Sequence, residues 1–262
     1  MGKNSKIEWT NHTANLWHGC TKVHEGCDNC YAEVLSHRWG NDVWGNDKPR
    51  KQVKSVWNDL AKYQKLAADA NEMHRVFVGS MMDIAEKPMP LIDNKGKTLK
   101  AGEMQLFTSD LRKKLFDDIS AGFYNNLMFL LLTKRPSNFN KQIPEEWKKN
   151  PPSNVMFGTS VVNQETANKL IPQLLEVNGK RFLSIEPQLD MIDIHKWLDH
   201  IHWVIVGGES GHKRRPYNLA WARNLRIQCH LAGVPFFFKQ IDKVREKTDG
   251  IPEELQIREF YK

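Results

Sequence analysis

The sequence predicts an α/β protein, a complete or partial TIM-like (β/α) barrel of parallel strands with an N-terminal cysteine loop and a helical insertion. Three observations lead to this prediction. Short apolar runs alternate with longer amphipathic stretches, the later runs recur at the spacing of a β-α unit, and the 262 residues accommodate six or seven such units in one domain. An open doubly wound sheet is the competing arrangement, because hydrophobic periodicity does not separate the two.

The predicted strands are short, rich in aliphatic or aromatic residues, and followed by polar or Gly/Pro turns. The first candidate, at residues 14–17, is the weakest. The others cover residues 75–79, 127–132, 154–158, 181–185, 203–207 and 235–239. Buried strands that alternate with helices imply a parallel sheet with right-handed crossovers.

Three segments between these runs have helical periodicity. In 109–123, Leu111, Leu115 and Ile119 recur on one face. The second segment, 165–177, contains Pro172, which is expected to interrupt it. The third, 219–231, is followed by Gly233 and then by a proline, which is a typical stop signal.

The remaining segments are predicted from their composition. Residues 40–65 are charged and contain two tryptophans, which indicates an insertion or a helical lid. Residues 93–104 and 141–153 are expected to be surface loops, and about 241–262 a C-terminal tail. No internal repeat or linker divides the chain, so we expect a single domain.

The composition is that of an ordinary soluble protein, with 40% hydrophobic and 26% charged residues. The longest strongly apolar run, 127–132, is too short to cross a bilayer, and residues 1–10 do not resemble a signal peptide. We therefore expect a cytoplasmic protein without a membrane partner. The net charge of +7 permits a nucleic acid or another anionic partner but does not require one.

The cysteines are distributed unevenly. Cys20, Cys27 and Cys30 fall within eleven residues, whereas Cys229 stands alone on the helix predicted over 219–231, where we expect it in the core. Disulfides are not expected in a reducing cytoplasm, and a clustered trio favours a metal or cluster site.

Three thiolates can hold three irons of a [4Fe–4S] cluster and leave the fourth iron open for a substrate or cofactor, whereas four thiolates would close it. A zinc site with His18 or His24 as the fourth ligand is an alternative. In a further alternative, only two of the three cysteines have a functional role.

Polar residues or glycines follow nearly every predicted strand. Because the carboxyl ends of parallel strands meet at one edge, we expect them to form a shared cofactor-binding pocket, although solvated charges are the simpler alternative. No catalytic residue is singled out. The candidate cofactor-binding residues are Ser80, Asp83, Lys134, Thr159, Ser160, Glu186, Gly207, Gly208, Glu209 and Lys239.

Two further features suggest a nucleic-acid or nucleotide partner. Residues 207–215 combine glycines with four side chains that can be cationic, which suits an anion, although a solvated basic loop is equally consistent. Tryptophans crowd the N-terminal quarter, where they can stack on bases or pack a lid against the barrel. They are Trp9, Trp17, Trp39, Trp44 and Trp57.

Blocks spread from residue 7 to about residue 240 resemble the phage-borne three-cysteine-motif proteins, a family similar to radical S-adenosylmethionine (SAM) enzymes. The blocks are Ile7-Glu-Trp-Thr10, Gly19-Cys20, 26–33, 131–136, 157–160, 183–187, 204–210 and 234–240. The resemblance implies a partial TIM-like barrel and a [4Fe–4S] cluster held by Cys20, Cys27 and Cys30. It also implies that SAM binds the open iron through its amino and carboxylate groups.

The same resemblance implies an activity. One-electron reduction by an electron donor would cleave SAM to methionine and a 5′-deoxyadenosyl radical, which abstracts hydrogen from an unknown substrate, for which a nucleotide or nucleic acid is the candidate. For a phage protein, the compartment would be the host cytoplasm. The alternative function is a non-catalytic module, stabilised by zinc or an Fe–S cluster, that binds nucleic acid or a protein.

The sequence departs from the radical SAM pattern in two places. The cysteines are spaced Cys-x6-Cys-x2-Cys, where the common pattern has three residues in the first gap. Gly207-Gly-Glu209 follows a late strand, whereas the Gly-Gly-Glu motif that meets the SAM amino group usually follows an early one. The early position here is Gly79-Ser-Met-Met-Asp83.

Overall fold

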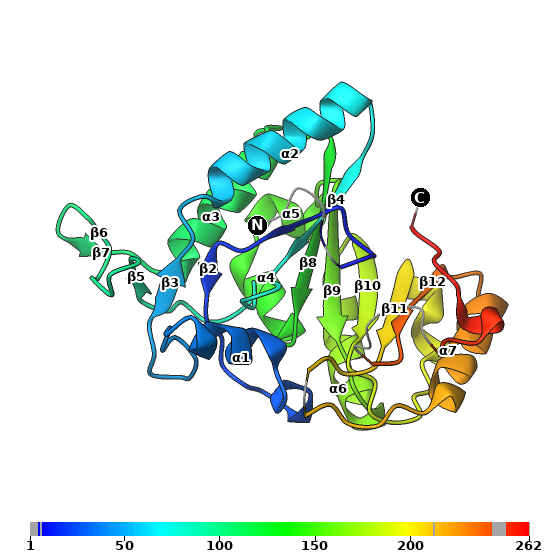
Figure 1. The fold of residues 1–262 in the computed structure, drawn as a ribbon. Coiled ribbons are helices and arrows are strands. Elements are labelled where there is room, and N and C mark those ends of the chain that lie inside the picture. Colours follow the sequence, from blue (N-terminus) through cyan, green and yellow to red (C-terminus); the bar gives the residue numbers. More distant parts are fainter. Residues whose placement is uncertain (1–4, 6, 212, 243–249, 262) are drawn as a thin grey trace.

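The computed structural model describes residues 5, 7–211, 213–242 and 250–261. Its centre is a seven-stranded parallel sheet, curled into a half-barrel and flanked by helices (Figure 1). Along the sheet the strands are β1 (His12–Ala14), β4 (His74–Val78), β8 (Leu127–Thr133), β9 (Val155–Ser160), β10 (Lys180–Ile185), β11 (Trp203–Gly207) and β12 (Phe236–Gln240).

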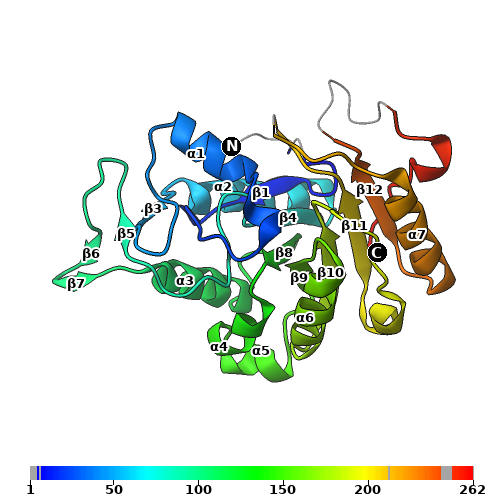
Figure 2. The same ribbon diagram turned by 90° about the horizontal axis from the view of Figure 1, so that it is seen from below.

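The strand order decides between the two arrangements that the sequence left open. Each strand of the main sheet pairs in parallel with the strand of the same sheet that precedes it in the chain. The strand order therefore never reverses. A doubly wound sheet needs such a reversal, at the point where the helices change face. The strand order therefore excludes a doubly wound sheet, and the curled half-barrel, seen along its curl in Figure 2, is consistent with a partial β/α barrel.

α2, α6 and α7 connect strands and pack on the convex side of the sheet. α2 contacts β1, β4 and β8, α6 contacts β9, and α7 contacts β11 and β12. The helices are α1 (Tyr31–Arg38), α2 (Val56–Ala70), α3 (Thr108–Ser120), α4 (Phe139–Gln142), α5 (Glu145–Lys149), α6 (Gln164–Leu175) and α7 (Leu219–Leu231). α2 starts within the expected insertion, 40–65, yet it packs on the sheet and connects two of its strands.

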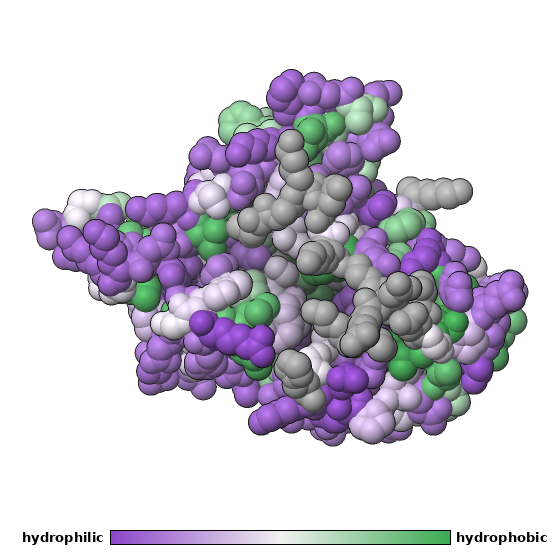
Figure 3. Space-filling view, in the orientation of Figure 1, coloured by the Kyte–Doolittle hydropathy of each residue, from purple (hydrophilic) through white to green (hydrophobic). Residues whose placement is uncertain are grey.

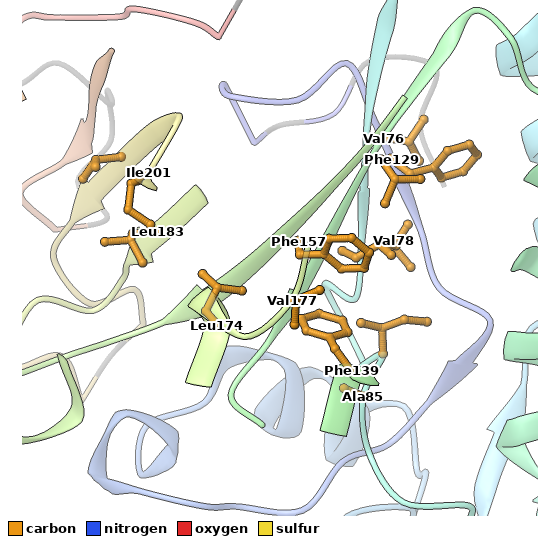
Figure 4. Packing of buried hydrophobic residues seen from close by; sticks show 14 of the residues in the cluster. Val76, Val78, Ala85, Phe129, Phe139, Phe157, Leu174, Val177, Leu183 and Ile201 are labelled. Atoms are coloured by element: carbon orange, nitrogen blue, oxygen red, sulfur yellow. The ribbon is translucent and has the colours of Figure 1, made fainter. Parts of the chain in front are cut away.

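Both faces of the strands are buried, which explains their almost continuously apolar sequences. Alternate side chains of each strand point to opposite faces. Val76, Val78 and Phe157 pack under the helices, where the Phe157 ring lies 5.0 Å from that of Phe139 in α4 (Figure 4). On the concave face Phe182 packs in a second cluster with Trp9 and Trp203, among others.

The concave face is filled so tightly that Gly158 of β9 has no room for a side chain. A Cβ on this residue would lie 2.3 Å from the Phe182 ring. Aromatic side chains therefore occupy this part of the barrel interior.

Several short elements accompany the main sheet. A second sheet contains β2 (Trp17–His18), β3 (Arg50–Gln52) and β5 (Leu91–Ile92), and a projecting hairpin contains β6 (Lys100–Ala101) and β7 (Met104–Gln105). Hydrophilic residues cover most of this hairpin (Figure 3). The 3-10 segments are η1 (Glu25–Cys27), η2 (Pro136–Asn138), η3 (His195–His200) and η4 (Glu253–Leu255).

Some local predictions need correction. The predicted loop 141–153 contains α5, because Trp147 is buried there against Phe116, with ring centroids 4.8 Å apart. Pro172 lies inside α6 without ending it, since Leu170, Ile171 and Leu174 are buried on its inner face. The predicted strand 14–17 is divided between β1 and β2, and the predicted loop 93–104 forms part of the exposed hairpin.

The described part of the C-terminal tail covers the free edge of β12. Phe238 donates its backbone N–H to Ile257 at 3.0 Å, and Glu259 donates to Phe236 at 3.1 Å. An unpaired edge strand would otherwise expose its backbone polar groups for pairing with another chain. None of the described helices is long and apolar enough to span a membrane.

Candidate functional site

A pocket of about 160 Å³ lies at the carboxyl ends of the sheet strands, under the loop that carries the three cysteines. We call it the cysteine pocket. The curl of the sheet brings the ends of β4, β8, β9, β10 and β12 together here, as the sequence predicted. The predicted site residues that line it are Cys20, Cys27, Cys30, Ser80, Asp83, Lys134, Ser160, Glu186 and Lys239.

The other predicted site residues lie elsewhere. Thr159 is fully buried in β9, where its hydroxyl donates to the backbone oxygen of Thr133 at 3.0 Å. Gly207, Gly208 and Glu209 do not line the cysteine pocket. A Cβ on Gly208 would lie only 1.6 Å from the backbone oxygen of Ile241, so close backbone packing alone requires glycine at this position.

Local structure orients the cysteine loop. Cys27 ends η1, whose first residue is preceded by His24, and the His24 Nδ1 accepts the backbone N–H of Gly26 at 3.1 Å. Cys30 is the N-cap of α1. The three thiols thus line one pocket, but within the described ranges no group of three His, Cys, Asp or Glu side chains is arranged to hold a metal ion.

The Cys20 thiol is surrounded by charges. Burial, together with the carboxylates of Asp83 and Glu86, raises its pKa to about 12, although the Arg135 guanidinium opposes them. The Arg135 Nη1 lies 3.9 Å from the Cys20 Sγ. In the metal-free chain this cysteine is therefore protonated at neutral pH, and a metal ion that binds it must displace the proton.

Asp83 fixes the end of β8. Its Oδ1 accepts from the Thr133 hydroxyl at 2.6 Å and from the Ala85 N–H at 2.9 Å, and its Oδ2 accepts from the Arg135 Nη1 at 2.6 Å and from the Lys134 N–H at 3.1 Å. Both oxygens are thus occupied by the protein itself, so Asp83 mainly positions the residues around it.

The sequence interpretation missed a buried ion pair behind this pocket. Arg50 and Glu86 lie 36 residues apart and pair through two hydrogen bonds of 2.8 and 2.7 Å. Arg50 also donates to the Thr21 hydroxyl at 2.9 Å, while Arg135 donates to the Thr21 backbone oxygen at 2.5 Å. Two arginines therefore hold the residue next to Cys20. The available signal in the sequence was Glu86 itself, a charged residue that directly follows Ile84 and Ala85.

A second ion pair lies on the opposite wall of the cysteine pocket. The Lys239 Nζ is 2.7 Å from the Glu186 Oε1, and the Trp9 indole N–H donates to the Glu186 Oε2 at 3.2 Å. Near the cysteine loop, the Tyr31 hydroxyl donates to the backbone oxygen of Ser80 at 2.9 Å. The pocket therefore contains both a cationic and an anionic side chain, surrounded by aromatic rings.

Glu209 connects the basic loop after β11 to the cysteine loop. It accepts from Arg215 at 2.7 Å and from the Asn29 amide at 3.0 Å, while Arg215 also donates to the Glu25 backbone oxygen at 3.1 Å. Burial by itself would raise the pKa of Glu209, but these hydrogen bonds hold it below its usual value. Of the predicted basic cluster 207–215, His212 lies outside the described residues.

The tryptophans and the lone cysteine have mostly structural roles. Trp9 and Trp17 are buried in the core, and Trp57 packs against it under the ammonium group of Lys114. Trp44 lines the cysteine pocket, whereas Trp39 is 57% exposed. Cys229 is fully buried in α7, which confirms the predicted core position.

Comparisons with known proteins give one result. A family model described as a protein of unknown function, DUF5131, matches residues 4–258. No curated protein and no solved structure matches the chain.

Proposed function

The chain belongs to the DUF5131 family, and we propose that it is an iron–sulfur, radical-SAM-like enzyme built on a partial TIM-like barrel. One observation carries the proposal. Three thiols from a single loop and the polar ends of five parallel strands line one pocket at the carboxyl edge of the half-barrel. Active sites of (β/α) barrels lie at this edge.

By the number and type of its donors, the pocket fits a [4Fe–4S] cluster with one open iron. Cys20, Cys27 and Cys30 would supply three thiolates, and the described residues that line the pocket include no fourth cysteine and no histidine. His18 and His24, the candidate fourth ligands of a zinc site, are not among the residues that line this pocket. Such a cluster supplies one electron, taken from an external donor, that breaks the C5′–S bond of SAM.

The other residues of the pocket would bind and orient SAM. SAM carries an ammonium and a carboxylate group, and the paired Glu186 and Lys239 offer the complementary charges. Arg135, held by Asp83, keeps the backbone next to Cys20 in place. The aromatic rings of Trp9, Trp44 and Tyr31 exclude water from part of the wall. All four cysteines are unpaired, in keeping with the reducing cytoplasm that we propose as the compartment.

The substrate that we propose is a nucleotide or a nucleic acid. The net charge of +7 and the cationic side chain of Lys213 in the loop after β11 support an anionic substrate, whereas Arg214 and Arg215 of the same loop are already paired with Asp242 and Glu209. Binding of RNA or DNA that weakens steeply with salt would be expected for a nucleic acid.

The test is metal analysis of protein purified and reconstituted without oxygen. We expect iron and sulfide in a ratio of about one to one, as in a [4Fe–4S] cluster, and release of 5′-deoxyadenosine when SAM and a reductant are added. Cys20→Ser, Cys27→Ser and Cys30→Ser should each lose iron, whereas Cys229→Ser, a change of the buried cysteine in α7, should retain it. Folded protein with stoichiometric zinc and no iron would refute the proposal. A stable cluster that never cleaves SAM would favour the non-catalytic module.

A further inference from the structure

A second hollow lies beside the cysteine pocket, and the proposed reaction does not use it. We call it the His24 pocket. Its volume is about 410 Å³, and it is bordered by the cysteine loop, the turn after β8, and one face of α6. Lys134 and Arg135 line both pockets, so the two share one edge.

His24 presents an unused hydrogen-bond donor here. Its Nδ1 accepts the Gly26 N–H at 3.1 Å and must therefore be unprotonated. A neutral imidazole has one acceptor and one donor nitrogen, so the proton is on Nε2. Nε2 is buried and has no hydrogen-bond partner in the described structure. A buried donor without a partner costs free energy, which a ligand atom at this position would recover.

The same pocket contains cations without a counter-charge. Neither Lys134 nor Lys169 forms an ion pair with any residue that the structure describes, whereas Arg135 is paired with Asp83 at 2.6 Å. The His24 pocket is thus bordered by the unpaired ammonium groups of Lys134 and Lys169 and by the His24 N–H. The carboxylate of Glu165 is the one negative charge among its described lining residues.

We propose that the His24 pocket binds an oxyanion of the phosphate class. A phosphate group has several acceptor oxygens on one centre, so it can accept from His24 Nε2 and from both lysines at once, with charge-assisted hydrogen bonds. The site does not depend on iron. Because the edge formed by Lys134 and Arg135 is shared, the phosphate can be free or can belong to a larger molecule that extends into the cysteine pocket.

The test measures binding of inorganic phosphate to the full chain by isothermal titration calorimetry in a low-salt chloride buffer. Lys169→Gln removes an exposed ammonium that lines only the His24 pocket and should weaken binding by about tenfold, the usual effect of losing a charge-assisted hydrogen bond. Lys62→Gln is the matched control, because Lys62 is an exposed lysine on α2 that forms no ion pair with any described residue. It should bind phosphate like the wild type.

A second measurement does not depend on any substitution. In protein labelled with ¹⁵N-histidine, added phosphate should shift the signal of the His24 Nε2–H group in the wild type. Adenosine monophosphate is titrated in parallel. If adenosine monophosphate competes with phosphate and binds more tightly, the site recognises the phosphate of a larger ligand. If the two bind equally well, the site recognises the free ion. Both outcomes support the site. Absent phosphate binding, or equal affinities of wild type and Lys169→Gln, would overturn it.

Discussion

Arg50 and Glu86 form a fully buried, two-point ion pair behind the cysteine loop. Their side chains are 0% and 2% exposed, and the Nε–Oε2 and Nη2–Oε1 distances are 2.8 and 2.7 Å. The remaining Arg50 donors reach the backbone oxygens of Val43, Lys48 and Gly45 and the Thr21 hydroxyl. One guanidinium therefore joins the cysteine loop, the segment before β3 and the segment after β4.

The first prediction concerns this pair. Glu86→Ala leaves the Arg50 charge buried without a partner and should lower the free energy of unfolding by about 3 to 5 kcal/mol. Urea denaturation measures the loss. The double variant Arg50→Met/Glu86→Met removes both charges and should lose less than the single variant. As a control, Asp117→Ala breaks the exposed pair with Lys113 and should cost at most about 0.5 kcal/mol. Equal losses of unfolding free energy in Glu86→Ala and Asp117→Ala would contradict the prediction.

The second prediction concerns Gly208. A Cβ would lie 1.6 Å from the Ile241 backbone oxygen, so Gly208→Ala must displace the backbone and should destabilise the fold by about 3 kcal/mol or more. Gly96→Ala is the control, since its Cβ meets no atom within 4 Å and only its positive φ of 80° is unfavourable. That change should cost about 1 kcal/mol. A Gly208→Ala protein of normal stability would restore the interpretation of Gly208 as a cofactor-binding position.

The third prediction concerns the contact between the basic loop and the cysteine loop. Arg215→Ala removes the hydrogen bonds to Glu209 and to the Glu25 backbone oxygen, so η1 should open more easily. Amide hydrogen exchange of Cys27 and Asp28, whose N–H groups bond within this segment, should accelerate by about tenfold. Arg223→Ala, which removes an exposed ion pair on α7, should leave these rates unchanged. Unaltered exchange in Arg215→Ala would show that the loop is held by other contacts.

The fourth prediction is a pH dependence that arises at the amino ends of β1 and β4. His12 is buried, stacks on Tyr63 with ring centroids 3.9 Å apart, and lies 3.0 Å from the His74 Nδ1. His74 in turn contacts Glu72. Burial, and then the charge of His74, lower the pKa of His12 from 6.5 to about 4. Between these two values the unfolded chain binds a proton that the folded chain does not, so this contribution is fully present above pH 6.5 and is lost as the pH falls towards 4.

The measurement compares wild type with His12→Gln. Relative to the variant, the wild type should lose about 2 to 3 kcal/mol of unfolding free energy between pH 7 and pH 4.5. His200→Gln changes an exposed histidine and should keep a constant difference from the wild type over that range. A His12 ring that titrates near pH 6.5 in an NMR experiment would refute the assignment.

Much of the scaffold is visible in the sequence because it depends on local patterns. The predicted helix 219–231 coincides with α7, and the predicted strand 203–207 coincides with β11. Trp147 shows where such reasoning fails. Its segment is short and polar, and only burial against Phe116 of α3, a distant part of the chain, makes it helical.

The candidate site divides in the same way. By itself, the sequence determined that three cysteines share one loop and that polar residues end the parallel strands, because spacing along the chain fixes both features. Only the tertiary structure decided that Asp83 is occupied by Arg135, that Glu209 holds Arg215, and that Glu86 neutralises Arg50. The physical reason is desolvation, because a charge that the fold buries must find its partner among whichever distant segments pack against it.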